Sequence, residues 1–352
     1  MMDLDFPYKL TCIAELSGHE DRAWNVAWNP TKPLLATCSA DKSVRLYSYA
    51  FSTSDPPAFT LHTSIPTGHS KTVRAVAWAP SGTTLATASF DANIGIWERE
   101  EDGSGEWECM SLLEGHETEC KSVAWSASGA LLASCSRDKT VWVWEVHPDA
   151  DFECMGVLME HSQDVKCVAW HPNEEILASA SYDDTIKLYL DDPSEDWFCF
   201  ATLTGHTSTV WALAWAPGGG YLASASDDCT VRIWKRIAEH QWECVCVLEE
   251  HGRTVYSVSW GAAQNAKSTD GENLGWLASA GGDGRINVWE LEEAPDATVK
   301  TPPKYKVIAR IENGHGESDI NHLAWCPREG LEGLLASAGD DGLARVWKIE
   351  AV

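Results

Sequence analysis

Hydrophobic and polar residues alternate with a period of two, in short stretches, along most of the chain. In each of seven similar units, one stretch ends in tryptophan, with Val or Leu two residues earlier and a small residue between. A second stretch reads Leu-Ala-Ser/Thr, a third alternates, and a fourth precedes the histidine of the next unit. Because successive side chains of a β-strand point to opposite faces, a period of two predicts strands. The pattern therefore predicts four short strands in each unit.

The seven units share a polar signature in the same register. A histidine opens each unit, and in the first five units an aspartate follows it 22 residues later. An aromatic residue lies six residues after each aspartate, and the sixth and seventh units keep this step despite ten and four extra residues. From the histidine to this aromatic residue, the units span 19–47, 69–97, 116–144, 161–189, 206–234, 251–289 and 315–347. Four strands in a repeat of about 40–45 residues predict an all-β, seven-bladed propeller.

Residues 8–16 read as a strand without a unit of their own. The last unit, in turn, lacks a fourth strand after its final aromatic residue. We expect residues 8–16 to pair with the final strand, at about 343–349, which closes the ring and removes a free sheet edge. Residues 1–352 are then predicted to form a single domain, since closed all-β folds run long.

The composition limits the functions that such a ring can have. The net charge is −27, from 53 acidic and 26 basic residues, and the resulting field repels nucleic-acid phosphates. No apolar run is long enough to span a bilayer, and the first five residues lack the features of a secretory signal. We therefore expect a cytoplasmic protein that binds neither nucleic acid nor membrane directly. Its 12 cysteines are then expected to be reduced thiols.

The cysteines do not have the spacing of a metal site. Five of them lie seven residues before a blade histidine, in five different outer strands: Cys12, Cys109, Cys154, Cys199 and Cys244. Only Cys244 and Cys246 lie close together in the sequence, with one residue between them. Because side chains alternate along a strand, both thiols would lie on one face. A ligand set would need further partners that the sequence does not supply. We therefore expect no metal and no cofactor.

The Gly-His, Ser/Thr, Asp and Trp positions resemble those of the WD-repeat family, over nearly the whole chain. The resemblance implies that a His, a Ser or Thr, an Asp and a Trp form a hydrogen-bonded tetrad that holds the strands of a blade together. Complete tetrads can be read as His69, Thr87, Asp91 and Trp97; His116, Ser134, Asp138 and Trp144; and His206, Ser224, Asp228 and Trp234. Tyr47 and Tyr189 replace the tryptophan in blades 1 and 4, where we expect altered geometry.

The Ser, His and Asp of each unit do not indicate a hydrolase. Seven copies of a catalytic triad make no chemical sense, and the sequence contains neither a nucleophile elbow nor a phosphate-binding glycine loop. Buried polar groups that satisfy one another explain these positions better. We therefore predict a binding platform that is not an enzyme.

The positions that vary between units carry the candidate binding residues. Two columns vary: the residue four positions before each strand tryptophan, and the residue directly before each blade aspartate. Because buried unpaired Arg and Lys are rare, the first column is expected at the solvent-exposed rim of the central channel. The two columns then place on one face Trp24, Arg74, Phe90, Lys121, Arg137, Lys166, Tyr182, Trp211 and Tyr256.

This set of four cations and five aromatic residues predicts recognition of an acidic or carboxylate-bearing protein segment. Arg and aromatic side chains dominate binding hot spots, and Arg can clamp a carboxylate through two hydrogen bonds. The alternative is that the cations are solvated or pair with Glu119 and Asp164. The opposite face is expected to be solvated or to meet a basic partner, because its loops are acidic or rich in Gly, Pro and Ser: 50–58, 98–102, 149–151, 191–196, 261–275 and 292–303.

Stretches outside the tetrads also resemble the WD-repeat proteins of cytosolic iron–sulfur protein assembly (CIA). These stretches are 107–109, 136–146, 179–189 and 208–211, whereas blade 6 and residues 50–58 depart from the pattern. The resemblance implies a scaffold of the targeting complex that delivers clusters to cytosolic and nuclear apoproteins and holds no cluster itself. The implied partners are a small α/β assembly factor, a HEAT-repeat scaffold, an iron-only-hydrogenase-like cluster carrier and client proteins, some with a short acidic–aromatic tail. The alternative is a generic WD-repeat adaptor in a chromatin or ubiquitin-ligase complex.

Overall fold

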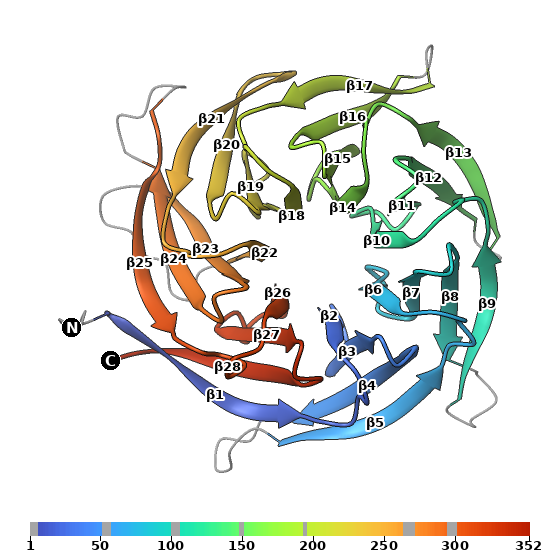
Figure 1. The fold of residues 1–352 in the computed structure, drawn as a ribbon, viewed down its shortest axis with the longest axis horizontal. Helices are drawn as coiled ribbons and strands as arrows, with labels where there is room; N and C mark the ends of the chain where they lie inside the picture. The colour runs from blue at the N-terminus through green and yellow to red at the C-terminus, as the bar shows by residue number, and fades with distance from the viewer. Residues whose placement is uncertain are drawn as a thin grey trace.

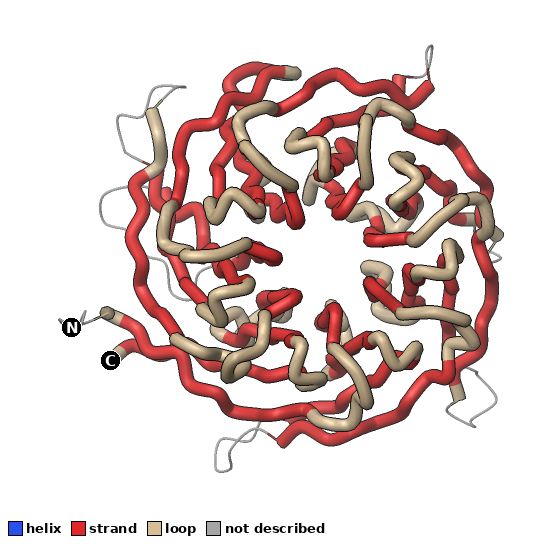
Figure 2. Tube along the Cα trace, viewed as in Figure 1, coloured by secondary structure: helices blue, strands red, loops and turns tan. Residues whose placement is uncertain are grey.

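The computed structural model describes residues 6–50, 58–99, 106–147, 151–192, 196–262, 272–293 and 301–352. In these ranges 28 strands form seven four-stranded antiparallel sheets around a central opening (Figure 1). Figure 2 shows strands joined by loops; the described ranges contain no helix, and so none that could cross a membrane. The predicted all-β, seven-bladed propeller is confirmed.

Each blade has four strands that follow one another from the channel outward. The innermost strands are β2 (Ala23–Trp28), β6 (Val73–Trp78), β10 (Cys120–Trp125), β14 (Val165–Trp170), β18 (Val210–Trp215), β22 (Val255–Gly261) and β26 (Ile320–Trp325). The second strands are β3 (Leu34–Ser39), β7 (Thr84–Ser89), β11 (Leu131–Ser136), β15 (Ile176–Ser181), β19 (Tyr221–Ser226), β23 (Glu272–Gly281) and β27 (Leu334–Gly339). The third strands are β4 (Ser43–Ala50), β8 (Ile94–Arg99), β12 (Val141–Val146), β16 (Ile186–Asp192), β20 (Val231–Ala238), β24 (Ile286–Glu293) and β28 (Ala344–Ala351). The outer strands are β5 (Ala58–Pro66), β9 (Trp107–Leu113), β13 (Phe152–Leu158), β17 (Asp196–Leu203), β21 (Gln241–Leu248), β25 (Lys304–Ile311) and β1 (Tyr8–Leu16).

Strands from the two ends of the chain close the ring. β1 pairs antiparallel with β28, from Tyr8 opposite Ala351 to Leu16 opposite Ala344, and is the outer strand of blade 7. Figure 1 shows these two strands side by side at one point of the ring. The predicted closure by residues 8–16 is confirmed, and it gives the free edge of β28 a partner.

The strand tryptophans of blades 1 to 5 join each of these blades to the preceding one. In blades 1 to 5 the indole Nε1–H at the end of the inner strand donates to a backbone carbonyl of the preceding blade, at 2.9–3.2 Å. Trp28, for example, bonds Ala324 of blade 7 across the ring closure. In blade 6, Trp260 instead bonds Leu274 of its own blade. The repeated tryptophan thus buries a large ring and supplies a specific inter-blade hydrogen bond.

The structure brings the members of each tetrad together. In blade 5 the indole of Trp234 donates to Ser224 Oγ at 2.8 Å, and Ser224 Oγ lies 2.7 Å from His206 Nε2. His206 Nδ1 lies 2.7 Å from the Asp228 carboxylate. Because a carboxylate only accepts, Nδ1 carries the ring proton and Nε2 accepts from the serine hydroxyl. Equivalent contacts join His69, Thr87, Asp91 and Trp97 in blade 2, and His116, Ser134, Asp138 and Trp144 in blade 3.

Blades 1 and 4 have different geometry, as expected from their tyrosines. In blade 1 the Tyr47 hydroxyl donates to the Ser17 carbonyl at 3.0 Å. In blade 4 the Tyr189 hydroxyl lies 3.4 Å from Ser179 Oγ, a longer contact than the 2.8–3.1 Å of the tryptophans in blades 2, 3 and 5. The tyrosine tetrads therefore lack the short indole bond.

In blades 1, 3 and 5, a third-strand side chain covers the glycine before the blade histidine, and this glycine also has a positive φ. A Cβ on Gly115 would lie 2.5 Å from the ring of Trp142, and an arginine occupies the equivalent space in blades 1 and 5. In blade 4 the glycine is replaced by Glu160. There the third strand carries Lys187, whose ammonium group donates to Thr202 on the outer strand instead. Glycine is therefore needed where a bulky third-strand side chain covers the loop.

The substitution Gly115→Ala tests this explanation. We expect it to destabilise the protein by about 1–3 kcal/mol, because the added methyl group forces Trp142 to move. The part of that cost that comes from the clash should disappear when Trp142→Lys is present, since lysine is the residue of blade 4 at this position. The part that comes from the positive φ of Gly115, +157°, should remain in both backgrounds. Thermal denaturation of the two single variants and the double variant measures the coupling. An equal cost of Gly115→Ala in both backgrounds would refute the explanation.

Candidate partner-binding site

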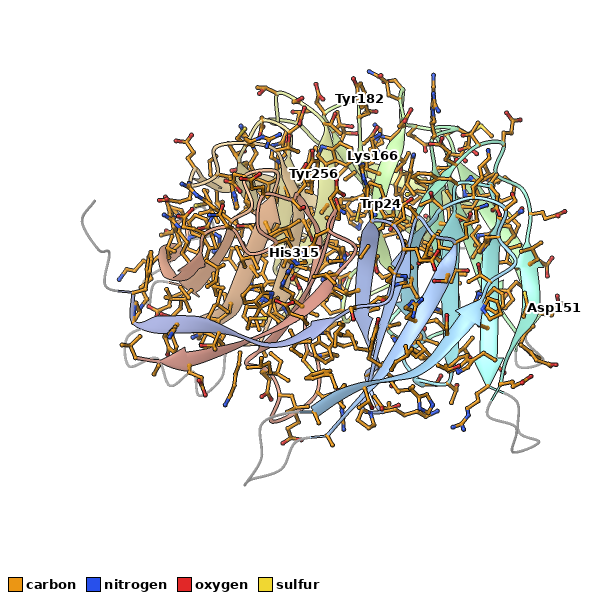
Figure 3. The ribbon with its side chains drawn as sticks, turned by 60° about the horizontal axis from the view of Figure 1, so that its bottom comes forward. Trp24, Asp151, Lys166, Tyr182, Tyr256 and His315 are labelled. Carbon is orange, nitrogen blue, oxygen red and sulfur yellow. The ribbon has the colours of Figure 1, made fainter. Side chains whose placement is uncertain are left out.

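The predicted rim residues gather at one mouth of the central channel, where the inner strands begin. A pocket of about 260 Å³ opens there, and its wall includes seven of the nine predicted residues: Trp24, Arg74, Phe90, Lys121, Lys166, Trp211 and Tyr256. Arg137 and Tyr182 lie beside this wall, with side chains that contact its members or their partners. Figure 3 shows the labelled Trp24, Lys166, Tyr182 and Tyr256 at this end of the ring, with Asp151 far out at the circumference.

Aromatic rings hold the cations of this mouth in place. The distances from cation to ring centre are 4.7 Å for Arg74 and Trp24, 4.0 Å for Lys121 and Phe90, 5.2 Å for Lys166 and Tyr182, and 5.0 Å for Lys166 and Trp211. Such contacts attract the cation electrostatically but do not neutralise it. The rings therefore orient the cations without neutralising their charge.

Two acidic residues link the cations of blades 3 and 4. Glu119 forms an ion pair with Lys121 and lies 3.5 Å from Arg137. Asp164 lies 3.3 Å from Lys166 and 4.0 Å from Arg137. These cations therefore do pair with Glu119 and Asp164, which was the alternative to anion recognition considered from the sequence. The Arg137 side chain is nevertheless 59% exposed, so its ion pairs are worth little and can exchange for others.

Glu119 and Asp164 belong to a third column, six residues before each strand tryptophan, which the sequence reasoning did not single out. The backbone carbonyl of this column accepts the N–H of the residue before the blade aspartate, as between Arg137 and Glu119 at 3.0 Å. The constant six-residue step would have identified the column. Its members are Arg22, Thr72, Glu119, Asp164, Thr209, Thr254 and Asp319.

Arg74 is the rim cation without an acidic partner. Among the described residues, no carboxylate lies within 4.0 Å of its guanidinium, which contacts the Trp24 ring. Burial lowers the pKa of Arg74, and burial also lowers the pKa of Lys121 despite its pairing with Glu119. Both directions show that positive charge is costly at this mouth. An entering anion would relieve that cost for Arg74 and Lys121.

His322 lies on the inner strand β26 of blade 7 and was not predicted. Its Nδ1 accepts the backbone N–H of Val26 at 3.4 Å. Burial, followed by the charge of Arg74, lowers the pKa of His322 to about 3. The imidazole is therefore neutral in the folded protein at neutral pH.

This histidine predicts a pH dependence of stability. Because the folded pKa lies below the unfolded value of about 6.5, the stabilisation is complete above pH 6.5 and is lost as the pH falls toward 3. We expect His322 to lower the free energy of unfolding by at most about 1.4 kcal/mol per pH unit below 6.5. The variant His322→Asn introduces the residue that blade 1 has at this position. Its free energy of unfolding should lack the part of the pH dependence that His322 causes. Urea denaturation between pH 7.5 and 4.5 compares the two; parallel curves would contradict the prediction.

The five outer-strand cysteines lie in five blades, each opposite the aromatic residue of its tetrad, as with Cys109 and Trp97. Each thiol lies at a β-bulge and donates to the carbonyl two residues further on, at 3.3–3.9 Å. The prediction that Cys244 and Cys246 share a face is wrong. The bulge places them opposite the consecutive residues Trp234 and Ile233, so Cys246 enters one core cluster and Cys244 packs against another.

One group of potential metal ligands occurs elsewhere in the described ranges. Glu145, His147 and Glu153 have ligand atoms within 4.8 Å of one another, at the surface of blade 3. His147 Nε2 lies 4.0 and 3.7 Å from the two carboxylates, which suits an exposed ion pair. We assign no metal to this group. The predicted acidic face cannot be described in full, because residues 51–57, 100–105, 148–150, 193–195, 263–271 and 294–300 lie outside the described ranges.

A closed ring of repeated blades with a cationic and aromatic mouth defines a WD-repeat binding platform. The repeat "WD domain, G-beta repeat" matches residues 10–48, 60–98, 107–145, 152–189, 197–235, 242–290 and 306–348. "Probable cytosolic iron-sulfur protein assembly protein 1" of Mycosarcoma maydis is 48% identical over 97% of this chain and 93% of its own length. "Probable cytosolic iron-sulfur protein assembly protein Ciao1" of Culex quinquefasciatus is 44% identical over 30% of this chain and 29% of its own length. The chain therefore belongs to the WD-repeat family and, within it, to the family of cytosolic iron-sulfur protein assembly protein 1.

Proposed function

We propose that this protein is a non-catalytic scaffold of the cytosolic iron–sulfur assembly machinery and helps to deliver clusters to apoproteins. The observation that carries this proposal is the 48% identity, over 97% of the chain, to a protein named for that assembly. The architecture supports it, because a ring closed by its own termini is a rigid surface on which partners can be arranged. The Ser, His and Asp of each blade are bonded to one another in its core, as structural residues are.

The partners follow from the same proposal. They are the other targeting subunits (a small α/β assembly factor and a HEAT-repeat scaffold), an iron-only-hydrogenase-like cluster carrier, and client proteins that receive clusters. The relatives' names refer to cytosolic iron-sulfur proteins, and we propose the cytoplasm as the main location of this protein and the nucleus as a second one. Residues 1–352 would act as one domain, with no cofactor of its own.

We further propose that the channel mouth binds an acidic–aromatic protein segment. Arg74 has no carboxylate partner in the described ranges, and Arg137 is exposed between two weak ion pairs. An incoming carboxylate would find Arg74 and Arg137 available, with Trp211 and Tyr256 as an apolar surface for an aromatic side chain. Client tails of this composition would fit the mouth.

Depletion of the protein in cells tests the scaffold function. We expect incorporation of radioactive iron into cytosolic iron–sulfur enzymes to fall several-fold, while incorporation into mitochondrial iron–sulfur enzymes is unchanged. Re-expression of the wild type should restore incorporation. Normal iron incorporation into cytosolic enzymes after complete depletion would rule out the proposal.

A further inference from the structure

The channel mouth carries negative charge on the wall opposite its cations. Asp319 and Asp340 of blade 7 line the same pocket as the rim cations. In a ring of seven blades, blade 7 faces the gap between blades 3 and 4, as the positions of β26, β10 and β14 show (Figure 1). Lys121 and Lys166 therefore stand across the pocket from the two aspartates.

The two aspartates lack a cation from their own blade. In blades 3 and 4 a lysine follows the acid by two residues, but blade 7 has Asn321 at that position. The Asn321 amide donates to Asp340 at 2.9 Å. Arg22 lies 3.4 Å from Asp340, and Arg253 lies 4.0 Å from Asp319, with the arginine side chains 55% and 66% exposed. Ion pairs this exposed contribute little, so a cation of a ligand can replace them.

An aromatic surface connects the two charged walls. The rings of Trp211 and Tyr256 meet edge to face, with centroids 5.3 Å apart, and both line the pocket. Trp211 lies beneath Lys166 at 5.0 Å. Tyr256 and Asp319 both lie next to Gly282, where an added Cβ would be 3.5 Å from the Tyr256 ring and 3.6 Å from the Asp319 carboxylate. In agreement with this position, burial and then the charge of Asp319 raise the pKa of Tyr256. A ligand that crosses the pocket thus meets a cation, two aromatic rings and then a carboxylate.

We propose that the pocket takes a segment with two opposite charges, an acidic group toward blades 3 and 4 and a basic side chain toward blade 7. This inference rests on the proposed binding of an acidic–aromatic segment and adds the charge order of the partner. A reversed segment would put like charges against both walls, and an entirely acidic one would face Asp319 and Asp340. The pocket therefore selects the direction in which its ligand lies across the channel.

Fluorescently labelled peptides that end in an acidic and an aromatic residue test this inference. One series carries a single lysine two, three, four or five residues before the acidic residue, and a matched series carries glutamine there. We expect one spacing at which the lysine peptide binds roughly five- to tenfold more tightly than its glutamine partner, measured by fluorescence anisotropy. In the variant Asp319→Asn/Asp340→Asn this gain should vanish, while the affinity of the glutamine peptide stays within about twofold.

Asp227→Asn is the matched control, because Asp227 lies on the same side of blade 5 but outside the pocket wall, bonded to Ser208 and Thr254. It should keep the gain. If lysine and glutamine peptides bind equally at every spacing, and both lose affinity in Arg137→Glu/Lys166→Glu, the charge order is wrong and the acidic-segment proposal stands. If no peptide of either series binds the wild type, both proposals fail.

Discussion

Replacing Arg137 and Lys166 together with glutamate is expected to weaken the binding of an acidic–aromatic peptide about 100-fold or more. Each charge-assisted contact contributes about 1.5–3 kcal/mol, and reversal adds repulsion to its loss. Asp164 adds to the repulsion because it would lose both of its cation partners, whereas Glu119 would keep Lys121. The remaining rim cations, Arg74 and Lys121, would then have four carboxylates near them on blades 3 and 4, in addition to Asp319 and Asp340 on blade 7.

The affinity can be measured by anisotropy or calorimetry with a peptide that ends in an acidic–aromatic tail. A variant with the same change in net charge is Lys306→Glu/Lys348→Glu, at exposed ion pairs away from the pocket wall. It should bind within about threefold of the wild type. The wild-type affinity should also fall as salt is added, because the contacts are partly exposed. Equal losses in the two double variants would mean that only net charge matters and that the rim is not the binding site.

The second large effect is expected in the tetrads. Ser224→Ala in blade 5 should destabilise the protein by roughly 2–4 kcal/mol, because it removes one hydroxyl that serves two buried partners. The Trp234 indole would lose its acceptor and His206 Nε2 would lose its donor, both in the interior. Burial raises the pKa of Asp228, but hydrogen bonds from His206 and Thr230 outweigh it and hold the pKa below its ordinary value. The network therefore also keeps this carboxylate charged.

Thermal denaturation measures this loss, and we expect the melting temperature to fall by roughly 3–8 °C. Ser162→Ala is the matched control, because Ser162 is an exposed loop serine whose backbone N–H, not its hydroxyl, is bonded to the tetrad aspartate of blade 4. It should change stability by less than about 0.5 kcal/mol. Tyr47→Phe should also cost less than Ser224→Ala, since the Tyr47 hydroxyl bonds a loop carbonyl. A Ser224→Ala variant as stable as Ser162→Ala would refute the structural role of the tetrad.

The fold could be predicted because the residues that define a blade recur seven times in the sequence. The step from aspartate to an aromatic residue is the same in all seven blades, and the step from histidine to aspartate is the same in the first five, so one blade's strands identify the others. The rim residues of the inner strands could be predicted for the same reason. A residue at a fixed sequence distance from Trp28 or its equivalents occupies the same position on the inner strand of every blade. Seven of the nine predicted residues line one pocket, although they come from six blades.

What could not be predicted depends on irregularity or on contacts between blades. The prediction that Cys244 and Cys246 lie on one face was wrong because the β-bulge between them cannot be recognised from the alternation of residues along the strand. His322 was missed because its pKa depends first on burial within the ring and then on the charge of Arg74, which is distant in the sequence. The proposed role of Asp319 could not be predicted from the sequence. Only closure of the seven blades into a ring brings blade 7 opposite the lysines of blades 3 and 4.

Quantitative co-purification with the wild type and with Arg137→Glu/Lys166→Glu tests the central claim most directly. Both tagged proteins would be expressed at equal levels and checked for equal melting temperatures, and the bound proteins quantified by mass spectrometry. We predict that the wild type recovers iron–sulfur assembly proteins and that the variant loses at least one of them or of their clients by about tenfold or more. Recovery of histones or cullin components by the wild type, without any iron–sulfur assembly protein, would contradict the account.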